Sequence, residues 1–353
     1  MSKHARALKG DIVFSETPGK LEIYEDGYII LFGNLIKGIY REIPEEHKDT
    51  RLFDYSGKLI IPGFVNSLAV SRNAEDSEKK EERVRRISED IWQEGTARLN
   101  IISEGSLEDS YYLMDYVESL GLGAYCCHER TEGKEYSLYD LEEFAIMSAN
   151  TRILVKPFIF LNEDEENIEE KLNIARLSNL KIAGRNVHRI KEKIENTGDY
   201  GRDIYKDILN IIDFSNGRGI SDFLDELPEN NAYCPYGEEI SEDEAETLKK
   251  LLREERLGIY TGDEHSVLKA LRHEQENRKI FSFKELFYMA TKGSGKFFGK
   301  TGSFEEFCSF DAAVIDDAEK KGSPEKRLER FLESGNKDEV FLRYVYGMKA
   351  LGK

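Results

Sequence analysis

The feature that most limits what this chain can fold into is a repeated alternation of charged helical segments with short apolar segments, beginning near residue 75. Strands that alternate with helices at this spacing form parallel sheets, and over such a length a closed (β/α) barrel is the favoured arrangement. We therefore predict an α/β fold. The expected strands are 97–102, 123–127, 153–160, 181–183 and 258–261, and the expected helices are 76–94, 107–119, 138–148, 163–177, 204–212, 241–255, 264–277 and 282–290.

The two ends of the chain have a different pattern, in which β-rich segments are separated by residues that favour tight turns. The turn residues are Pro18-Gly19, Glu25-Asp26-Gly27 and Gly33-Asn34. We expect both ends to form one small β-sandwich-like domain, 1–62 with 303–353, and residues 63–302 to form a (β/α)8-type TIM barrel. The expected strands of the small domain are 11–14, 21–24, 28–32, 35–40, 58–65, 311–316 and 339–346, with a helix over 324–333.

The charge balance narrows the classes of partner. The 353 residues include 51 Lys and Arg against 69 Asp and Glu, a net charge of −18. Nucleic acids and anionic membranes repel a chain with this large a negative net charge, so we expect neither as a partner. No apolar window of about 18 residues is present to span a bilayer. The first residues lack the apolar core of a signal peptide, so the expected location is the cytoplasm.

The cysteines and the common short motifs point to no other chemistry. The chain contains no nucleophile elbow, no phosphate-binding loop and no dinucleotide-binding glycine motif after a strand. No two cysteines form a C-x-x-C pair, and a disulfide between adjacent residues is strained. We expect reduced thiols in or near a core at Cys126, Cys127, Cys234 and Cys308.

Several motifs, in order along the chain, resemble those of the guanine deaminase group of the metal-dependent amidohydrolases. Residues 59–71 (Leu-Ile-Ile-Pro-Gly-Phe-Val-Asn-Ser-Leu-Ala-Val-Ser) resemble the first barrel strand of that superfamily, which reads PGFVDxHxH. Residues 93–96 (Gln-Glu-Gly-Thr) stand where the group has NGTT. Residues 289–305 and 311–316 resemble its ATxxGAxxLGxxIGSxExGKDADxVVID segment. The resemblance covers about 1–130 and 280–353 and agrees with a TIM barrel.

The resemblance implies hydrolytic deamination, in which Zn²⁺ or a similar ion lowers the pKa of a bound water to about 7. The family needs two His at i and i+2 on the first barrel strand, one His on each of two later strands, and an Asp on the last. Here the first two positions hold Leu68 and Val70, whose side chains have no lone pair to donate, and Asn66 replaces the usual Asp. We therefore predict that the family metal, Zn or Fe, is absent and that no other cofactor replaces it.

Five residues remain as candidates for a pocket or a relic of the site. His188 corresponds to the middle SHLSE motif or is a surface helix residue. Tyr236 and Glu239 take the two His positions of an HCxHLSxEE motif, although Glu239 also suits the polar start of a helix. Asp263 is either the displaced Asp of a GTD motif or a helix cap, and His265 is either part of the HS pair that follows or an ordinary residue at a helix start. The candidates are His188, Tyr236, Glu239, Asp263 and His265.

At most one or two ligands remain in this set, whereas a zinc site needs three or four. The family's substrate loop before Gly258 is missing, so we expect the barrel to be reduced or distorted. We predict a catalytically degenerate guanine deaminase-like relative: a non-catalytic or regulatory subunit, forming a homodimer or a heteromer with an active amidohydrolase, or a binder of a purine-like small molecule. The alternative is an amidohydrolase that hydrolyses C–N bonds of a purine or other cyclic amidine with a non-standard or absent metal site.

Overall fold

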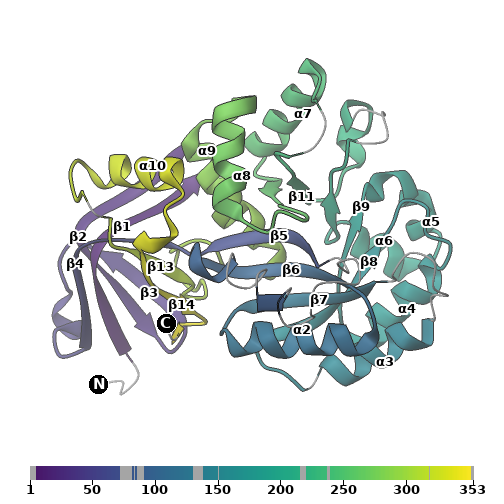
Figure 1. Ribbon diagram of the computed structural model, residues 1–353, viewed down its shortest axis with the longest axis horizontal. Coiled ribbons are helices and arrows are strands. Elements are labelled where there is room, and N and C mark those ends of the chain that lie inside the picture. Colours follow the sequence, from purple (N-terminus) through teal and green to yellow (C-terminus); the bar gives the residue numbers. More distant parts are fainter. Residues whose placement is uncertain are drawn as a thin grey trace. The chain divides into compact units, whose positions relative to one another are not determined.

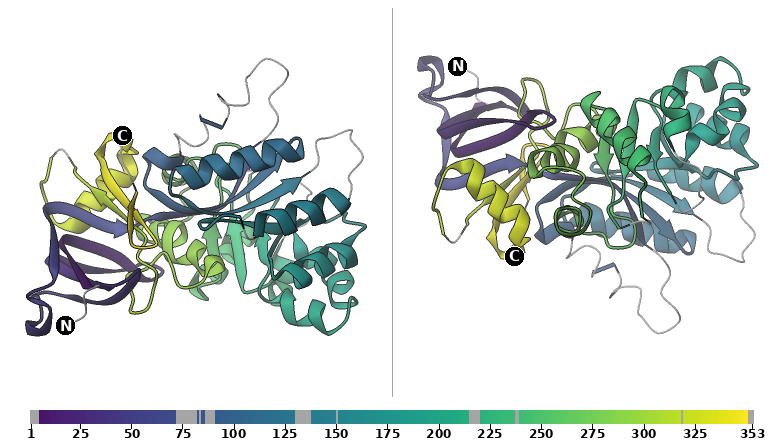
Figure 2. Two further views of the ribbon diagram at one scale, coloured as in Figure 1. Left: turned by 90° about the horizontal axis from the view of Figure 1, so that it is seen from below. Right: turned by 90° about the horizontal axis from the view of Figure 1, so that it is seen from above.

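The structure, a computed structural model, describes residues 5–71, 82, 84–85, 91–129, 138–149, 151–214, 220–236, 239–317 and 319–350 (Figures 1 and 2). The chain divides into two units. Unit 1 consists of Met1–Val65, Asp90–Arg98 and Ser266–Lys353, and unit 2 consists of Asn66–Glu89 and Leu99–His265. The domain boundaries drawn from the sequence, at residues 62 and 303, stay a prediction.

Unit 1 contains a seven-stranded sheet to which both ends of the chain contribute, as predicted. The strand order is β15-β14-β13-β4-β1-β2-β3, and only β1 and β4 are parallel neighbours. The strands are β1 (Ala5–Thr17), β2 (Lys20–Phe32), β3 (Leu35–Tyr40), β4 (Arg51–Pro62), β13 (Ala312–Ile315), β14 (Val340–Val345) and β15 (Met348–Ala350). The helices of this unit are α8 (Val267–His273), α9 (Phe283–Tyr288) and α10 (Pro324–Ser334), with short helices η1 (Glu45–His47), η4 (Glu274–Arg278), η5 (Met289–Gly293), η6 (Lys296–Phe298) and η7 (Lys337–Glu339).

Alternate residues of these strands face one apolar core, because successive side chains of a strand point to opposite faces. Leu8, Ile12 and Phe14 of β1 pack there with residues of β14 and with Phe310. Each fully buried large side chain stabilises the fold by roughly 1.5–3 kcal/mol. The Tyr55 and Tyr344 hydroxyls lie 2.7 Å apart, so these buried polar groups are partnered.

One turn predicted in this unit is wrong. The segments 21–24 and 28–32 are not two strands but one, β2, and the residues between them form a bulge. Gly10 pairs with Gly27 and Ile12 with Tyr24, so the register shifts between these pairs. Asp26 has a φ of 50°, and its backbone N–H donates to the Asp11 carboxylate at 2.9 Å. Residues that suit a tight turn also suit a bulge, because both need the left-handed conformation.

Unit 2 contains most of an eight-stranded sheet with the order β12-β11-β10-β9-β8-β7-β6-β5. The recorded pairs from β7 to β12 are parallel, and no strand of the expected barrel is missing. The strands are β5 (Phe64–Ser71), β6 (Thr96–Glu104), β7 (Gly123–Glu129), β8 (Val155–Leu161), β9 (Lys181–Arg185), β10 (Leu209–Ile211), β11 (Asn230–Tyr233) and β12 (Leu257–Ile259).

Helices cover the outer face of this sheet (Figure 1). Ile159 and Leu161 of β8 pack on α3 and α4 through one apolar cluster, which explains the apolar stripes of these helices. The helices are α2 (Leu107–Ser119), α3 (Leu138–Ala149), α4 (Ile168–Ser178), α5 (Lys191–Glu195), α6 (Asp199–Tyr205) and α7 (Glu242–Arg253), with η2 (Val187–Ile190) and η3 (Ile220–Glu226).

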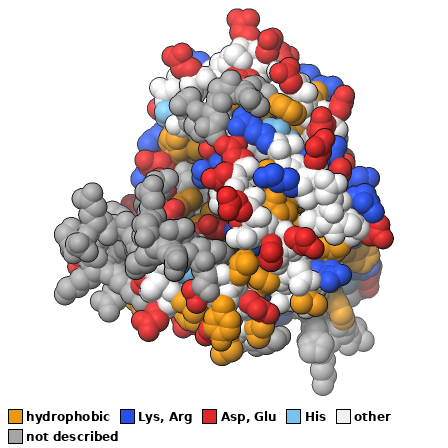
Figure 3. Space-filling model, turned by 90° about the vertical axis from the view of Figure 1, so that its right-hand side faces the viewer, with side chains coloured by type: hydrophobic (Ala, Val, Ile, Leu, Met, Phe, Trp, Pro, Cys, Tyr) orange, Lys and Arg blue, Asp and Glu red, His pale blue; other side chains and the backbone are white. Residues whose placement is uncertain are grey.

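Figure 3 shows one face of the molecule, where basic side chains are interspersed with acidic ones. Among the described residues, no helix has the length and apolarity to cross a bilayer.

The helix predicted over 204–212 is wrong beyond Tyr205. Helix α6 ends at Tyr205, and Leu209–Ile211 is strand β10, which lies between β9 and β11. Asn210 explains the difference: its side-chain oxygen accepts from Val187 N at 2.9 Å, and its amide donates to Asn231 at 3.0 Å. Strands β11 and β15 were not predicted, because three or four residues are too few to show a period. Most of the helix expected over 76–94 lies outside the described residues.

The buried carboxylate of Glu94 holds the start of α8. Its side chain is fully buried and accepts four hydrogen bonds, from Thr96 Oγ1 at 2.8 Å, Ser266 Oγ at 2.7 Å, Val267 N at 2.9 Å and Leu268 N at 3.1 Å. A carboxylate at a helix N-terminus satisfies backbone N–H groups that have no partner within the helix. Glu94 therefore replaces water as the acceptor for these donors.

We predict that Glu94→Gln lowers the free energy of unfolding by about 2–3 kcal/mol, because an amide turns one acceptor into a donor facing other donors. The measurement is the urea midpoint followed by circular dichroism. The matched control is Glu108→Gln in the exposed first turn of α2, which should change stability by less than about 0.5 kcal/mol. Equal losses in the two variants would contradict this account.

Candidate functional site

In a (β/α) barrel, side chains at the carboxyl ends of the strands form the site. On β5 the two positions at which the resemblance requires histidines are apolar and buried. Leu68 is 1% exposed and Val70 is 7% exposed. Each contributes apolar packing of roughly 1.5–3 kcal/mol, and neither can donate a lone pair to a metal.

The segment that follows β12 is hydrogen-bonded to β5. Thr261 N and Gly262 N both donate to Leu68 O at 3.1 Å, and Val70 N donates to Gly262 O at 3.0 Å. The Asn66 amide donates to Thr261 Oγ1 at 2.7 Å and to the backbone oxygen of His265 at 3.3 Å. These bonds join the first and last strands of the barrel sheet and fix the position of His265.

His265 lies in this junction with a ring nitrogen directed at the backbone. Its Nε2 is 2.7 Å from Val70 O. Because a carbonyl oxygen only accepts, Nε2 must carry the hydrogen, and a nitrogen that carries hydrogen has no lone pair for a metal. Asp263, two residues earlier, is exposed. Both candidates therefore follow β12, and Nε2 of His265 is not available as a metal ligand because it donates to Val70 O.

His188 is buried, so its interpretation as a surface helix residue is wrong. It lies in η2 after β9 and is 3% exposed. Its ring centroid is 4.9 Å from that of Phe223, and neither ring nitrogen has a hydrogen-bond partner among the described residues. Burial lowers the pKa of His188 to about 4, and the neighbouring Arg189 acts in the same direction. The imidazole is neutral at physiological pH.

The remaining two candidates follow β11. Tyr236 is half-buried, and Glu239 is exposed. Within the described part of the chain, the His, Cys, Asp and Glu side chains form no group of three or more that could hold a metal ion. Cys126 and Cys127 are buried with a raised thiol pKa, because burial disfavours the thiolate. They are packed thiols, as predicted, rather than nucleophiles.

A cluster that the sequence did not indicate lies at the ends of the neighbouring strands β9, β10, β11 and β12. We call Arg185, Asp213, Cys234 and Tyr260 the strand-end cluster. Arg185 ends β9, and its Nε is 3.4 Å from the carboxylate of Asp213, which follows β10. The Tyr260 hydroxyl donates to Ile212 O at 3.3 Å. Burial raises the pKa of Tyr260, and the neighbouring Cys234 and Asp213 raise it further.

Asn186 holds the backbone of Asp213 in place. Its side-chain amide donates to Asp213 O at 3.1 Å, and its side-chain oxygen accepts from Asp213 N at 3.1 Å. Arg185 and Asp213 are 40% and 23% exposed, so the ion pair is accessible to solvent. The sequence signal was weak: each residue ends a short apolar segment, but the four are far apart along the chain.

A second charged group lies at the ends of β7 and β8. Lys171 of α4 is 3% exposed; its Nζ donates to Phe160 O at 3.0 Å and to Glu165 at 2.6 Å, and lies 3.7 Å from Glu129. Burial raises the pKa of Glu129, and Lys171 opposes this effect. A partly exposed carboxyl group with a raised pKa is a candidate acid or base.

The donor set does not fit the metal that the resemblance implies. The two β5 positions are apolar, His265 Nε2 is hydrogen-bonded to a carbonyl, and Asp213 is paired with Arg185. A guanidinium beside the carboxylate repels a divalent cation and competes for the same oxygens. The described side chains at the strand ends therefore do not match the donor set that a zinc or iron ion needs.

Comparisons with known proteins bear on the fold. No family model and no curated protein matches this sequence. Among solved structures, the guanine deaminase of C. acetobutylicum with bound guanine has 21% identity and a TM-score of 0.77, covering 98% of this chain and 100% of that chain. The E. coli guanine deaminase has 14% identity and a TM-score of 0.69, covering 100% of each chain. The Helicobacter pylori aminofutalosine deaminase has 14% identity and a TM-score of 0.72, covering 99% of this chain and 100% of that chain.

The burial of His188 predicts a pH dependence of stability. The unfolded chain takes up the proton near pH 6.5 and the folded chain near pH 4, so acidification favours unfolding between these values. We predict that the stability of the wild-type protein relative to His188→Gln falls by up to about 3 kcal/mol between pH 7 and pH 4. The measurement is urea unfolding of both proteins across this range. A stability difference that stays constant with pH would show that His188 does not titrate in this way.

Proposed function

We propose that this chain, which has the fold of the guanine deaminases and related amidohydrolases, binds a purine-like small molecule at the carboxyl ends of its barrel strands without metal-dependent turnover. The proposal rests on which side chains lie at those strand ends. Leu68 and Val70, at the positions where the resemblance requires metal-binding histidines, are apolar and buried, whereas Arg185 and Asp213 form an accessible ion pair at the ends of β9 and β10.

The ion pair offers the hydrogen-bonding groups that a guanine edge requires. A guanidinium donates to the O6 and N7 acceptors of guanine, which is the pairing that arginine makes with this base in nucleic acids. A carboxylate accepts from the ring and exocyclic N–H groups on another edge. One solved structure that matches in fold holds guanine in its active site, which supports a purine as the first ligand to test.

The same residues explain why we propose binding without turnover. Hydrolytic deamination needs an activated water beside the carbon that bears the amino group. The described residues supply no group of three metal-ligating side chains, and Arg185 already engages the Asp213 carboxylate. A ligand would therefore be held and oriented while the nucleophile of the family reaction is lacking.

The experiment is equilibrium dialysis with labelled guanine, with ammonia release followed in the same samples. We predict saturable binding, no ammonia, and about a tenfold or greater loss of affinity in Asp213→Asn and Arg185→Gln, because each removes a charged hydrogen-bond partner. The matched control is Arg202→Gln, whose side chain is 57% exposed in α6 and makes an ion pair with Asp199. Binding that is unchanged in all three variants would contradict the proposal.

A metal-independent hydrolase is the second candidate, and Glu129 is the observation that favours it. Its raised pKa and its place beside Lys171 at the end of β7 suit a general acid or base. Ammonia release that persists with a chelator and disappears in Glu129→Gln would favour this reaction over binding alone.

A further inference from the structure

A cavity of about 300 Å³ in unit 1 has a buried arginine side chain, Arg343, among the residues that line it. The cavity lies beside β14, whose Leu342 and Tyr344 face the apolar core of the sheet, so Arg343 points to the opposite face. Arg343 is 3% exposed. The cavity is lined by Trp92, Gln93, Lys337, Asp338, Val340, Phe341, Leu342, Arg343 and Ala350.

The guanidinium of Arg343 is held but not neutralised. Its Nη1 donates to Thr96 O at 3.1 Å, and its central carbon lies 4.2 Å from the centroid of the Trp92 ring. Its Nη2 is buried and has no hydrogen-bond partner in the part of the chain that the structure describes. Burial lowers the pKa of Arg343 to about 9. A buried guanidinium nitrogen without an acceptor is costly, so an anion that reached Nη2 would be bound favourably.

Other buried arginines of this unit show what Arg343 lacks. Arg98 donates to the Asp311 carboxylate at 2.7 and 2.9 Å, and Arg327 donates to Asp317 at 3.0 Å. The carboxylate that acts electrostatically on Arg343 is Glu94. That carboxylate already accepts four hydrogen bonds from Thr96 and the start of α8, so it leaves Nη2 without an acceptor.

We propose that this cavity is a binding site for a small organic carboxylate that carries a flat apolar group. The carboxylate would accept from Nη2 of Arg343, in the pairing that a guanidinium favours. Trp92, Val340 and Phe341 supply apolar walls, and an indole face suits a flat ring. Lys337 and Gln93 line the same cavity as polar groups, whereas Asp338 at the rim opposes an anion.

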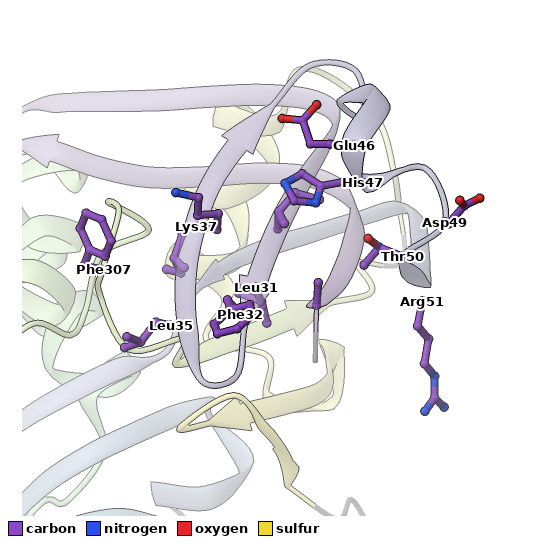
Figure 4. A pocket seen from close by; sticks show the side chains of 13 residues that line it. Leu31, Phe32, Leu35, Lys37, Glu46, His47, Asp49, Thr50, Arg51 and Phe307 are labelled. Atoms are coloured by element: carbon purple, nitrogen blue, oxygen red, sulfur yellow. The ribbon is translucent and has the colours of Figure 1, made fainter. Parts of the chain in front are cut away.

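A larger cavity in the same unit lacks such a selective group. It has a volume of about 590 Å³ and lies near the ends of β2 and β3 (Figure 4). Phe32, Leu35 and Phe307 are among its exposed apolar side chains. The charged side chains that line it are exposed or half-buried, and none is a buried group without a partner. Of these two cavities, the Arg343 cavity is the one with a buried group that would select a ligand.

The experiment uses Trp92 as its own reporter, because it is the single tryptophan of the chain. The full-length protein is titrated with benzoate, with neutral benzamide of the same shape, and with inorganic phosphate, and the indole fluorescence is followed. We expect a saturable response to benzoate and about tenfold or more weaker responses to the other two, because benzamide lacks the charge and phosphate lacks the ring. A response to benzamide or phosphate as tight as that to benzoate would overturn the proposal.

Substitutions test whether the change in Trp92 fluorescence comes from a ligand in the Arg343 cavity. Arg343→Gln should abolish it, whereas Arg202→Gln, which removes the same charge from an exposed position of unit 2, should leave it unchanged. Asp338 is exposed, so Asp338→Asn should fold normally and tighten benzoate binding about two- to threefold at low salt. An undiminished response in folded Arg343→Gln, or no effect of Asp338→Asn, would count against the site. If Arg343→Gln does not fold, the Asp338→Asn result decides.

Discussion

The barrel of this protein depends on hydrogen bonds that join its first strand to the segment after its last. Leu68 O accepts from two backbone N–H groups, Val70 N donates to Gly262 O, and the Asn66 amide donates to Thr261. In the deaminases that the sequence resembles, side chains from the first and last strands share a metal ion. Here the same strands are joined by the backbone and by one buried amide, with apolar side chains between them.

That junction determines what the site can do. The Nε2–H group of His265 donates a hydrogen bond to Val70 O, so this nitrogen cannot bind a metal ion. Polar side chains lie instead at the ends of β9 and β10, where Arg185 and Asp213 form a partly exposed ion pair. A guanidinium and a carboxylate recognise the edges of a planar heterocycle, but they do not activate water as a metal does. This arrangement is the basis on which we propose binding without metal-dependent turnover.

The sequence predicted the features that depend on local pattern. Helix α2 spans residues 107–119 as expected, and α7 (Glu242–Arg253) lies within the helix expected over 241–255. The absence of histidine at Leu68 and Val70 was visible, because the preceding Pro-Gly-Phe-Val motif fixes the register of the resemblance. The strand-end cluster was not visible, because the barrel brings together residues from strands that are far apart in sequence. The burial of His188 against Phe223 is likewise a tertiary contact, and the charged neighbours of His188 in sequence suggested the opposite.

The most direct test of the central claim is elemental analysis of the protein purified from cells supplied with zinc and iron. Ammonia release from guanine would be measured before and after addition of Zn²⁺ or Fe²⁺. A donor set without the β5 histidines predicts far less than one metal ion per chain and no ammonia release under either condition. About one tightly bound metal ion per chain, together with ammonia release, would show that residues other than a β5 histidine pair hold the metal and would contradict the account.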